Sequence, residues 1–276
     1  MHRIYNSPTN YSGSKTKILP QLLEYFPKKE DVSTFYDIFT GGLSVSINTN
    51  YNKTISNDII PALINFYKNL KKASDEDKIE EEIQKILSYK IDKIDKEKFL
   101  KYRKEFNIEK NDPYIFFTLI CSSTNNLMRF NKKFEYNQTF GKRSINDNTV
   151  KKLIEYCNIL KNKNITFTNH HYSNFFQLSN IQKEDFVYLD PPYGQTCAGY
   201  NSIWSKRDEE YLYSIIDSLD KNGIRFALSG VSIHKGIKNP FIDRLSKYKI
   251  INIDQSYEKV AKIKGLKSQE ILVINY

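Results

Sequence analysis

The feature that most constrains this chain is a short apolar run that stops at a carboxylate and two prolines. Phe186–Leu189 reads Phe-Val-Tyr-Leu and is followed by Asp190-Pro191-Pro192-Tyr193. An apolar run of this length predicts a strand buried on both faces of a parallel sheet. Proline fixes φ and lacks an N–H, and it holds the preceding residue extended, so the strand must end here. Asp190 is therefore expected at the carboxyl edge of the sheet, where open α/β sheets bind ligands.

The groups at this strand end suggest a chemistry. The Asp190 carboxylate and the Pro191 carbonyl, which has no regular backbone partner, are two neighbouring hydrogen-bond acceptors. Two acceptors suit an NH2 group with two hydrogens, and the ring of Tyr193 suits a planar base. The alternative is that the stretch is only a strand followed by a Pro-Pro turn, and the rest of the chain has to decide.

A second strand end carries glycines. Thr34–Phe39 predicts a strand, Thr40-Gly41-Gly42-Leu43-Ser44 a tight turn, and a helix is expected to begin near Ser44. Thr54–Asn57 predicts a further strand, which ends in Asp58, 17 positions after Gly41. Strand, glycine turn and helix form the first half of a nucleotide-binding unit, and an acid at this spacing binds ribose hydroxyls.

The glycine turn could bind either of two classes of nucleotide ligand. A pyrophosphate-binding dehydrogenase expects G-x-G-x-x-G, which the turn lacks. A nucleoside without phosphates, such as S-adenosylmethionine (AdoMet), needs only the close turn and the ribose acid. Upstream, Asn10–Lys15 is a loop of small residues before an amphipathic helix, and free N–H groups at such a start favour anions. The apolar stripe of that helix comprises Ile18, Leu19, Leu22, Leu23 and Phe26.

The middle of the chain has a different character, without a predicted strand. Periodic apolar patterns predict successive helices over 61–71, 75–88, 96–106 and 112–122. Residues 125–143, called here the basic segment, mix aromatics, amides and five cations with one acid, and predict a loop or β-hairpin. This composition suits phosphate contacts plus readout of base edges. A merely solvated basic loop is the alternative.

The α/β pattern then resumes. It predicts helices over 148–161, 207–219 and 240–248, strands over 165–168 and 224–229, and a closing strand pair over 250–253 and 270–274. Residues 194–205 form a loop with the single tryptophan, Trp204. Residues 255–269, between the closing strands, hold one acid, Glu258, and form either a second DNA-facing loop or a solvated turn. Their cations are Lys259, Lys262, Lys264 and Lys267.

Composition limits the function classes. The chain carries 42 Lys+Arg against 32 Asp+Glu, a net charge of +10, which is compatible with a nucleic-acid partner. A codon usage that favours lysine would also raise the net charge. Cys121, Cys157 and Cys197 lie far apart, so neither disulfides nor a zinc site is expected. His170 and His171 would point to opposite sides of a strand, so no joint metal site is expected. Without a signal peptide or a membrane-spanning run, a soluble cytoplasmic protein is predicted.

Together these motifs resemble the Dam-like family (D12 class, alpha group) of DNA adenine-N6 methyltransferases. Asp-Pro-Pro-Tyr is similar to the family's catalytic motif, and Asp37–Ser44 to its glycine motif. The basic segment resembles the family's recognition hairpin, through Leu127-x-Arg129-Phe130-Asn131, Glu135-Tyr136-Asn137 and Phe140-Gly141. The resemblance covers nearly the whole chain and preserves the motif order.

The resemblance implies a Rossmann-like, AdoMet-dependent methyltransferase fold, a mixed sheet flanked by helices. Residues 1–59 and 151–276 would form the catalytic domain, and 60–150 a helical target-recognition insert with its hairpin at about 125–143. The implied reaction transfers the AdoMet methyl to N6 of a flipped-out adenine in double-stranded DNA, without metal. Whether a cognate restriction endonuclease accompanies the chain stays open.

The resemblance also implies roles for residues. The catalytic residues would be Asp190, Pro191, Pro192 and Tyr193. The cofactor would be bound by Tyr11, Gly13, Lys15, Asp37, Phe39, Gly41, Gly42, Asp58 and Asp190. DNA would be bound by Asn125, Leu127, Arg129, Asn131, Lys132, Lys133, Thr139, Lys142 and Arg143.

The chain departs from the family pattern at four positions. Leu43 stands where the family commonly has glycine, and Asn10, Thr124 and Thr139 replace residues that help GATC-specific members to read or stack on DNA. GATC is therefore not implied as the target. Two alternative functions remain: cytosine-N4 methylation, which the same geometry suits, and a catalytically silent DNA-binding protein. Asp37, rather than asparagine, at the first position of the glycine motif favours adenine within the family.

Overall fold

A mixed, eight-stranded sheet forms the centre of the described part of the chain. The computed structural model describes residues 3–8, 13–192, 204–234, 237–240, 242–254 and 269–276. The strand order is β3-β2-β1-β4-β5-β8-β7, with β6 paired to β5. The first five strands of this order are parallel, and β8, β7 and β6 pair antiparallel. The strands are β1 (Phe35–Asp37), β2 (Thr54–Asn57), β3 (Ile165–Thr168), β4 (Phe186–Leu189), β5 (Arg225–His234), β6 (Ile237–Lys238), β7 (Lys249–Ile253) and β8 (Gln269–Ile274).

The predicted doubly buried strand is confirmed as β4, at the middle of the sheet. All four of its residues are buried. Phe186 and Tyr188 pack into one hydrophobic cluster, and Val187 and Leu189 into another on the opposite face, as the two-residue period of a strand requires. The α/β fold class and the antiparallel closing pair β7 and β8 are likewise confirmed.

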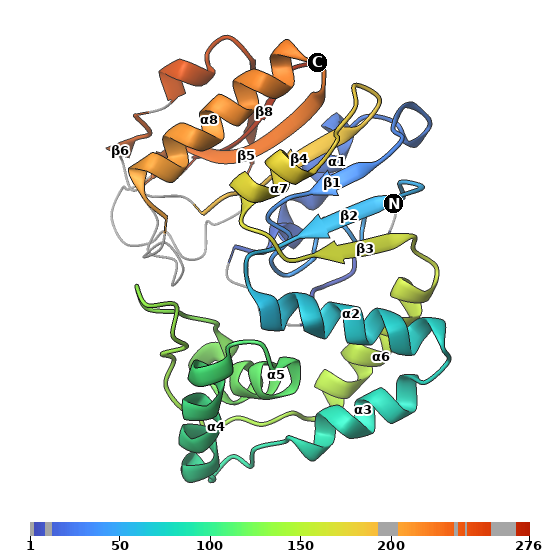
Figure 1. Cartoon of the computed structure of the whole chain (residues 1–276), viewed down its shortest axis with the longest axis vertical. Coiled ribbons are helices and arrows are strands. Elements are labelled where there is room, and N and C mark those ends of the chain that lie inside the picture. Colours follow the sequence, from blue (N-terminus) through green and yellow to red (C-terminus); the bar gives the residue numbers. More distant parts are fainter. Residues whose placement is uncertain (1–2, 9–12, 193–203, 235–236, 241, 255–268) are drawn as a thin grey trace.

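Helices cover both faces of this sheet (Figure 1). One face is covered by α1 (Leu19–Tyr25), which buries Leu19 and Leu22. The other face is covered by α7 (Tyr172–Leu178) and α8 (Lys206–Lys221). A capping box between Ser205 and Asp208 begins α8, which explains why this helix starts immediately after the loop. Short 3-10 helices are η1 (Lys15–Lys17), η2 (Lys29–Asp31), η3 (Thr124–Asn126) and η5 (Ile242–Leu245).

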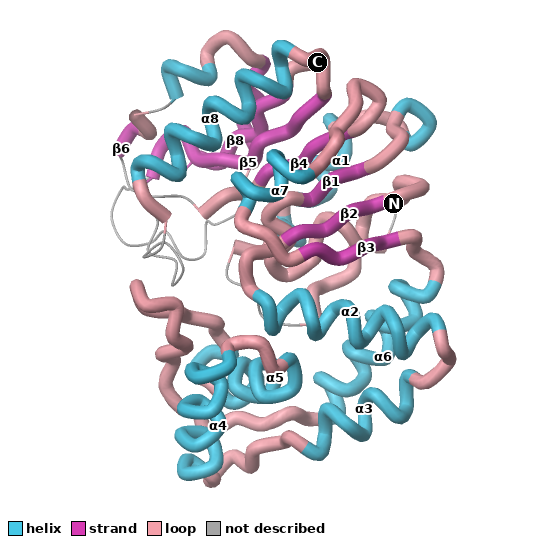
Figure 2. The backbone as a smooth tube through the Cα atoms, in the orientation of Figure 1, coloured by secondary structure: helices cyan, strands magenta, loops and turns pink. Residues whose placement is uncertain are grey.

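A helical insert lies beside the β3 edge of the sheet and contains no strand among its described residues (Figure 2). Proline stands in the first turn of two of its helices, where its missing N–H costs nothing. Asp95 and Asp112 cap helix starts by accepting backbone N–H groups. The predicted helices are confirmed as α2 (Pro61–Asp75), α3 (Ile79–Ser88), α4 (Lys96–Glu109), α5 (Pro113–Ser122) and α6 (Asp147–Lys161).

One hydrophobic core joins this insert to the glycine turn and to the edge of the sheet. It includes Leu43 and Ile47 from the turn region, Ile165 and Phe167 from β3, and apolar side chains of all the insert helices. Helix α6 packs on α2 and α3. The division into residues 60–150 and the remainder therefore stays a prediction, while the packing shows a continuous interior.

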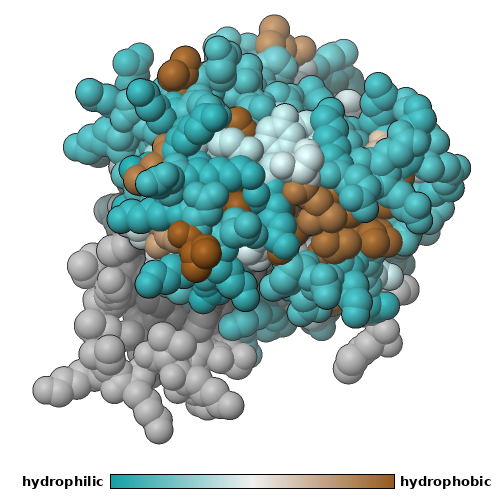
Figure 3. Space-filling view, turned by 90° about the horizontal axis from the view of Figure 1, so that it is seen from below, coloured by the Kyte–Doolittle hydropathy of each residue, from teal (hydrophilic) through white to brown (hydrophobic). Residues whose placement is uncertain are grey.

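The surface of the molecule at the insert end is mainly hydrophilic, with separate hydrophobic patches (Figure 3). Ile94 and Ile108 are the most exposed large hydrophobic residues of the insert, at 92% and 71%. Single exposed apolar side chains are common on monomeric proteins and need no partner to explain them. None of the described helices is long and apolar enough to cross a membrane.

Three sequence-based expectations about secondary structure were wrong. Turns replace the helix expected near Ser44, because side chains compete for the backbone: Asn48 donates to the Ser44 carbonyl and Thr49 to that of Ser46. Residues 240–248 contribute only η5. His170 and His171 do not lie on a strand; His171 caps the unpredicted helix α7, and no metal-binding group of three or more residues occurs among the described residues.

Candidate active site

A cavity lined by charged, polar and aromatic side chains lies at the carboxyl ends of β1, β2 and β4. Its volume is about 390 Å³, within the range of small-molecule sites. Four of the sequence motifs contribute to its wall: the amino-terminal loop, the glycine turn, Asp58 and the Asp190-Pro191-Pro192 stretch. The position agrees with the expectation that ligands bind at this edge of an α/β sheet.

The glycine turn is held in a left-handed conformation at two of its residues. Gly41 has φ of 44° and Leu43 has φ of 62°. Such φ values are natural for glycine and disfavour other residues, which explains why a glycine in place of Leu43 would fit. The Leu43 side chain is fully buried in the core shared with the insert, and this burial offsets the backbone strain. The hydroxyl of Tyr67, in the insert helix α2, donates to the Gly41 carbonyl at 2.8 Å and helps to fix the turn.

Asp37 ends β1 inside the cavity, and its two oxygens differ in their surroundings. Its Oδ2 accepts hydrogen bonds from Ser46 Oγ at 2.6 Å and from Thr40 Oγ1 at 3.0 Å. Its Oδ1 is buried and has no hydrogen-bond partner among the described residues. Burial raises the pKa of the Asp37 carboxyl to about 7. A buried acceptor of this kind fits a ligand that brings a positively charged donor.

Asp58 directly follows β2 and binds the glycine turn. Its Oδ2 accepts from the Gly41 N–H at 2.9 Å, and its Oδ1 from the Ile60 N–H at 3.0 Å. Burial raises the pKa of the Asp58 carboxyl to about 6, although both backbone bonds favour its charged form. The structure thus brings Asp58 and the glycine turn together as the spacing predicted. Its role toward a ribose stays a prediction.

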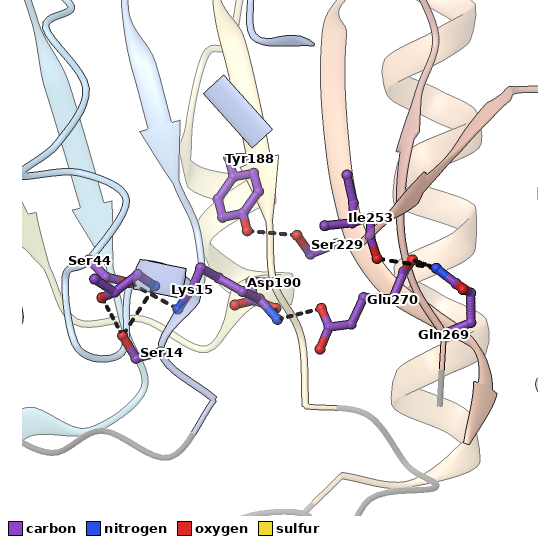
Figure 4. A network of polar contacts seen from close by, with 10 residues as sticks. Ser14, Lys15, Ser44, Tyr188, Asp190, Ser229, Ile253, Gln269 and Glu270 are labelled. Carbon is purple, nitrogen blue, oxygen red and sulfur yellow. Dashed lines mark hydrogen bonds and ion pairs between the residues drawn. The ribbon is translucent and has the colours of Figure 1, made fainter. Parts of the chain in front are cut away.

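Asp190 belongs to a cluster of three charged residues, with Lys15 and Glu270 (Figure 4). The Nζ of Lys15 lies 3.1 Å from Asp190 Oδ1 and 3.4 Å from Glu270 Oε2. Burial by itself lowers the pKa of Lys15, but the two carboxylates outweigh this effect, so the pKa lies above its ordinary value. Lys15 is therefore a charged residue held between the Asp190 strand end and β8. It links the amino-terminal motif to the Asp-Pro-Pro stretch.

Aromatic side chains form a further wall of the cavity. Trp204 lies 5.8 Å from Phe39 and 5.2 Å from Tyr172, measured between ring centroids. The rings of Phe39 and Tyr172 are 5.5 Å apart. Pro192 lines the same cavity. This side offers flat apolar surface for a planar ring, opposite in character to the charged side around Lys15.

The basic segment reaches the cavity with two stacked rings. Phe130 and Phe134 lie 4.9 Å apart with nearly parallel planes, and both line the cavity. The segment is a loop held by isolated bridges at Ser123–Phe140 and Phe130–Tyr136, rather than a regular hairpin. Gly141 is needed there, because a Cβ would come within 2.4 Å of the Ser123 backbone.

The cations of the basic segment point to the surface. Lys132, Lys133, Lys142 and Arg143 are exposed. Arg129 is exposed too, but its Nε donates to Asn137 Oδ1 at 2.9 Å and its Nη2 to the Asn137 carbonyl at 3.0 Å. The one acid of the basic segment, Glu135, accepts a hydrogen bond from Asn131 Nδ2 at 2.7 Å.

The remaining predicted DNA contacts also lie on this segment. Asn125 is exposed and has φ of 59°, and Leu127 is half-buried. The hydroxyls of Thr124 and Thr139 lie 2.9 Å apart at the surface, so the two unusual threonines face each other. Asn131 uses its Oδ1 to hold the turn through the N–H groups of Lys133 and Glu135. Their roles toward DNA stay predictions.

The structure brings most of the predicted cofactor and catalytic residues to one cavity, but not all can be placed. Tyr11 and Tyr193, and the cations of the 259–267 loop, lie outside the described residues. Sequence reasoning missed Glu270, Phe134 and His170 as cavity-lining residues and left Trp204 as a loop residue. A carboxylate at the start of an otherwise apolar strand was the only signal for Glu270.

Comparison with known proteins agrees with this arrangement. The sequence profile of the D12 class N6 adenine-specific DNA methyltransferases matches residues 11–259. The type II methyltransferase M.FokI of Planomicrobium okeanokoites is 37% identical, and the modification methylase StsI of Streptococcus sanguinis is 35% identical. Each alignment covers 98% of this chain and 43% of the relative, so the chain spans less than half the length of these two proteins.

A relative of similar length is also found. The type II methyltransferase M.MjaIII of Methanocaldococcus jannaschii is 29% identical, over 96% of this chain and 97% of its own length. The matched regions include the glycine turn, the insert and the Asp-Pro-Pro stretch, because the alignments run over nearly the whole chain.

Proposed function

Because this chain belongs to the D12 class of N6 adenine-specific DNA methyltransferases, we propose that it transfers the methyl group of AdoMet to N6 of an adenine in duplex DNA, at a specific sequence. The observation that carries the proposal is the shared cavity. It joins the glycine turn, the Asp190 strand end and the aromatic tip of the basic segment in one space. Cofactor, target base and DNA-facing loop would thus meet at one point.

The cavity residues fit AdoMet. The orphaned Oδ1 of Asp37 can accept the ammonium group, which is the charged donor that this buried oxygen lacks. Asp58 stands beside the glycine turn where ribose hydroxyls would lie, and Phe39 offers a ring face for the adenine. AdoMet supplies an activated methyl group when bound. Gly13, Lys15, Gly41 and Gly42 complete the proposed cofactor site, together with Tyr11.

Asp190 would orient the target. The amino group of a paired adenine is buried in the base stack, so the base must be flipped out of the duplex to reach the cavity. The Asp190 carboxylate and the Pro191 carbonyl would accept its two amino hydrogens, and Pro192 and Tyr193 would hold the ring. The nitrogen lone pair would then face the methyl group, and transfer would depend mainly on positioning.

The Asp58→Ala variant is expected to bind AdoMet more weakly by about 1–3 kcal/mol, the value of a charge-assisted hydrogen bond. The change removes the proposed ribose ligand and also leaves the Gly41 N–H without its acceptor. Titration calorimetry with the purified protein measures the effect. Asp185→Asn is a matched control, since Asp185 is also buried and accepts backbone N–H groups but lies at the opposite end of β4. Equal AdoMet affinity in wild type and Asp58→Ala would remove Asp58 from the site.

Affinity for AdoMet is expected to fall as pH decreases below about 7. The folded pKa of Asp37 is about 7 against an ordinary value of 3.8, so the carboxylate protonates in this range and stops attracting the ammonium group. Stability of the free protein has the opposite sign: the native state binds the proton more tightly than the unfolded state, so the melting temperature should rise as pH falls from about 7 toward 4. Calorimetry and thermal melts across this range measure both effects.

The Asp37→Asn variant provides the control for this pH dependence, because it cannot ionise. It should bind AdoMet weakly at every pH and lose most of the slope. A slope that persists in Asp37→Asn would assign the dependence to another cavity group, such as Asp58, whose pKa is about 6.

Transfer of a tritiated methyl group tests the proposed function. Incorporation into random duplexes with adenine as the acceptor base, and none into duplexes in which every adenine carries an N6-methyl group, is the expected result. Incorporation at cytosine would show the N4 reaction instead. Binding of duplex DNA without incorporation would indicate a silent DNA-binding protein. Sequencing of DNA modified by the expressed protein would then give the recognition site.

The biological setting follows the relatives as a proposal. M.FokI is named a type II methyltransferase and StsI a modification methylase, which supports a role in protecting DNA from a cognate restriction endonuclease. Such a nuclease would fail to cut DNA that carries the mapped methyl group. A cytoplasmic location remains a prediction, and it is compatible with cellular DNA as the proposed substrate.

A further inference from the structure

We propose that Glu270 is a positioning residue that holds the Lys15 ammonium while Asp190 accepts the amino group of the target base. The inference rests on the proposed function. It assigns a role to a residue that belongs to none of the cofactor, catalytic or DNA-reading motifs. Glu270 would act through Lys15, without touching the base.

The geometry supplies the first argument. Lys15 is only 5% exposed, and its Nζ lies between two carboxylates, 3.1 Å from Asp190 and 3.4 Å from Glu270. The three residues come from distant parts of the chain: η1, the residue after β4, and the start of β8. Figure 4 shows the Lys15 ammonium pointing toward both carboxylates at the carboxyl edge of the parallel strands.

Competition for Asp190 supplies the second argument. In the free protein, Lys15 lies against the same carboxylate that the proposed function requires for the target amino group. In the proposed complex, the amino group of the base and the ammonium share the Asp190 carboxylate, which weakens the contact between Lys15 and Asp190. A buried ammonium without a partner is strongly unfavourable. A second carboxylate already at 3.4 Å removes this penalty, because Lys15 can shift toward it without leaving the site.

The surroundings of Glu270 show that its place is fixed by the fold. It pairs with Val231 of β5 and with Ile253 of β7 in the sheet register. The amide of the neighbouring Gln269 donates to the Ile253 carbonyl at 3.2 Å and to the Glu270 carbonyl at 2.9 Å (Figure 4). The Glu270 side chain is 15% exposed, an unusual state for a glutamate unless it is paired. The strand therefore presents the carboxylate to Lys15 in a defined position.

The Glu270→Gln variant separates charge from shape, since glutamine has nearly the same volume. With saturating AdoMet and DNA, its single-turnover rate of methyl transfer should fall about 10- to 100-fold, in the range of couplings between contacting charged residues. Affinity for DNA should stay unchanged, and saturating AdoMet removes any effect of the variant on cofactor binding from the measured rate. Glu270→Asp keeps the charge on a shorter side chain and should recover part of the rate.

A double-mutant cycle with Lys15→Met tests whether Glu270 acts through Lys15. If it does, Glu270→Gln should cause no further loss of rate in the Lys15→Met background, because no ammonium remains to be held. The matched control is again Asp185→Asn, a buried carboxylate at the far end of β4. It should lower the melting temperature and leave the rate unchanged.

Several results would overturn the inference. A wild-type rate in folded Glu270→Gln would show that Lys15 needs no second partner. A loss confined to AdoMet affinity would make Glu270 a cofactor ligand, and an equal loss with and without Lys15 would make it an independent residue. Adenine methylation by the wild-type protein is measured first. Its absence would refute the proposed function rather than the role of Glu270.

Discussion

Replacement of Asp190 by alanine is expected to lower the rate of methyl transfer by at least about 100-fold, in the range of a positioned catalytic group. The variant loses the carboxylate that would accept an amino hydrogen of the target base. It should remain folded, since the buried β4 strand ends before Asp190 and Lys15 keeps Glu270 as a partner. The same loss should appear with saturating AdoMet and DNA, because the missing interaction orients the reacting nitrogen.

Single-turnover kinetics with tritiated AdoMet on the mapped site measure this loss. Thermal melts and AdoMet titration on the same preparation show whether fold and cofactor binding survive. Asp190→Asn is an informative companion, because it keeps the shape but offers an NH2 donor where an acceptor is needed. A folded Asp190→Ala protein with near-normal turnover would refute the proposed orientation of the target.

The Arg129→Ala variant is expected to bind the true site more weakly by about 1–3 kcal/mol and to lose discrimination at one base pair. Arginine reads guanine through two parallel bonds to O6 and N7. In the free protein, two of its five N–H donors bind Asn137, which holds the guanidinium at the surface of the basic segment. The remaining donors can face a base edge while this brace stays in place.

Two control variants separate reading from bracing. Asn137→Ala removes the brace but keeps the arginine, so it should cost less in discrimination than Arg129→Ala. Lys133→Ala should weaken all sequences alike and reduce the salt slope of binding by about one unit, as expected for a phosphate contact. Competition assays with single-base-pair variants of the mapped site give the preference profile. An unchanged profile in Arg129→Ala, together with lower thermal stability, would leave the arginine only a structural role.

The fold was largely predictable because its strands and helices carry strong periodic signals. The run Phe186–Leu189 predicted a strand buried on both faces, and the glycines after β1 predicted the turn beside Asp58. The Ser44 region failed because hydrogen bonds from serine, threonine and asparagine side chains to the backbone are invisible to apolar periodicity. Helix α7 has only seven residues, too few to establish a period.

The site residues that belong to a sequence motif could be predicted. The residues that only the tertiary structure brings to the cavity could not. Asp37 is the last residue of β1, and Asp58 and Asp190 directly follow β2 and β4, so neighbouring parallel strands bring the three together. Glu270 reaches the same cavity from an antiparallel strand whose order in the sheet no local pattern reveals. Phe134 itself has a left-handed φ of 58°, which sequence periodicity does not indicate.

The single core that joins Leu43 and Phe167 to the insert has a consequence for evolution of specificity. An insert that packed only on itself could be exchanged between enzymes as a cassette, carrying a new target sequence with it. Here the glycine turn contributes Leu43 to the interior of the insert, and Tyr67 of the insert binds the Gly41 carbonyl in return. New specificity in this lineage is therefore expected to arise by substitutions on the surface of the basic segment, rather than by recombination at the insert boundaries.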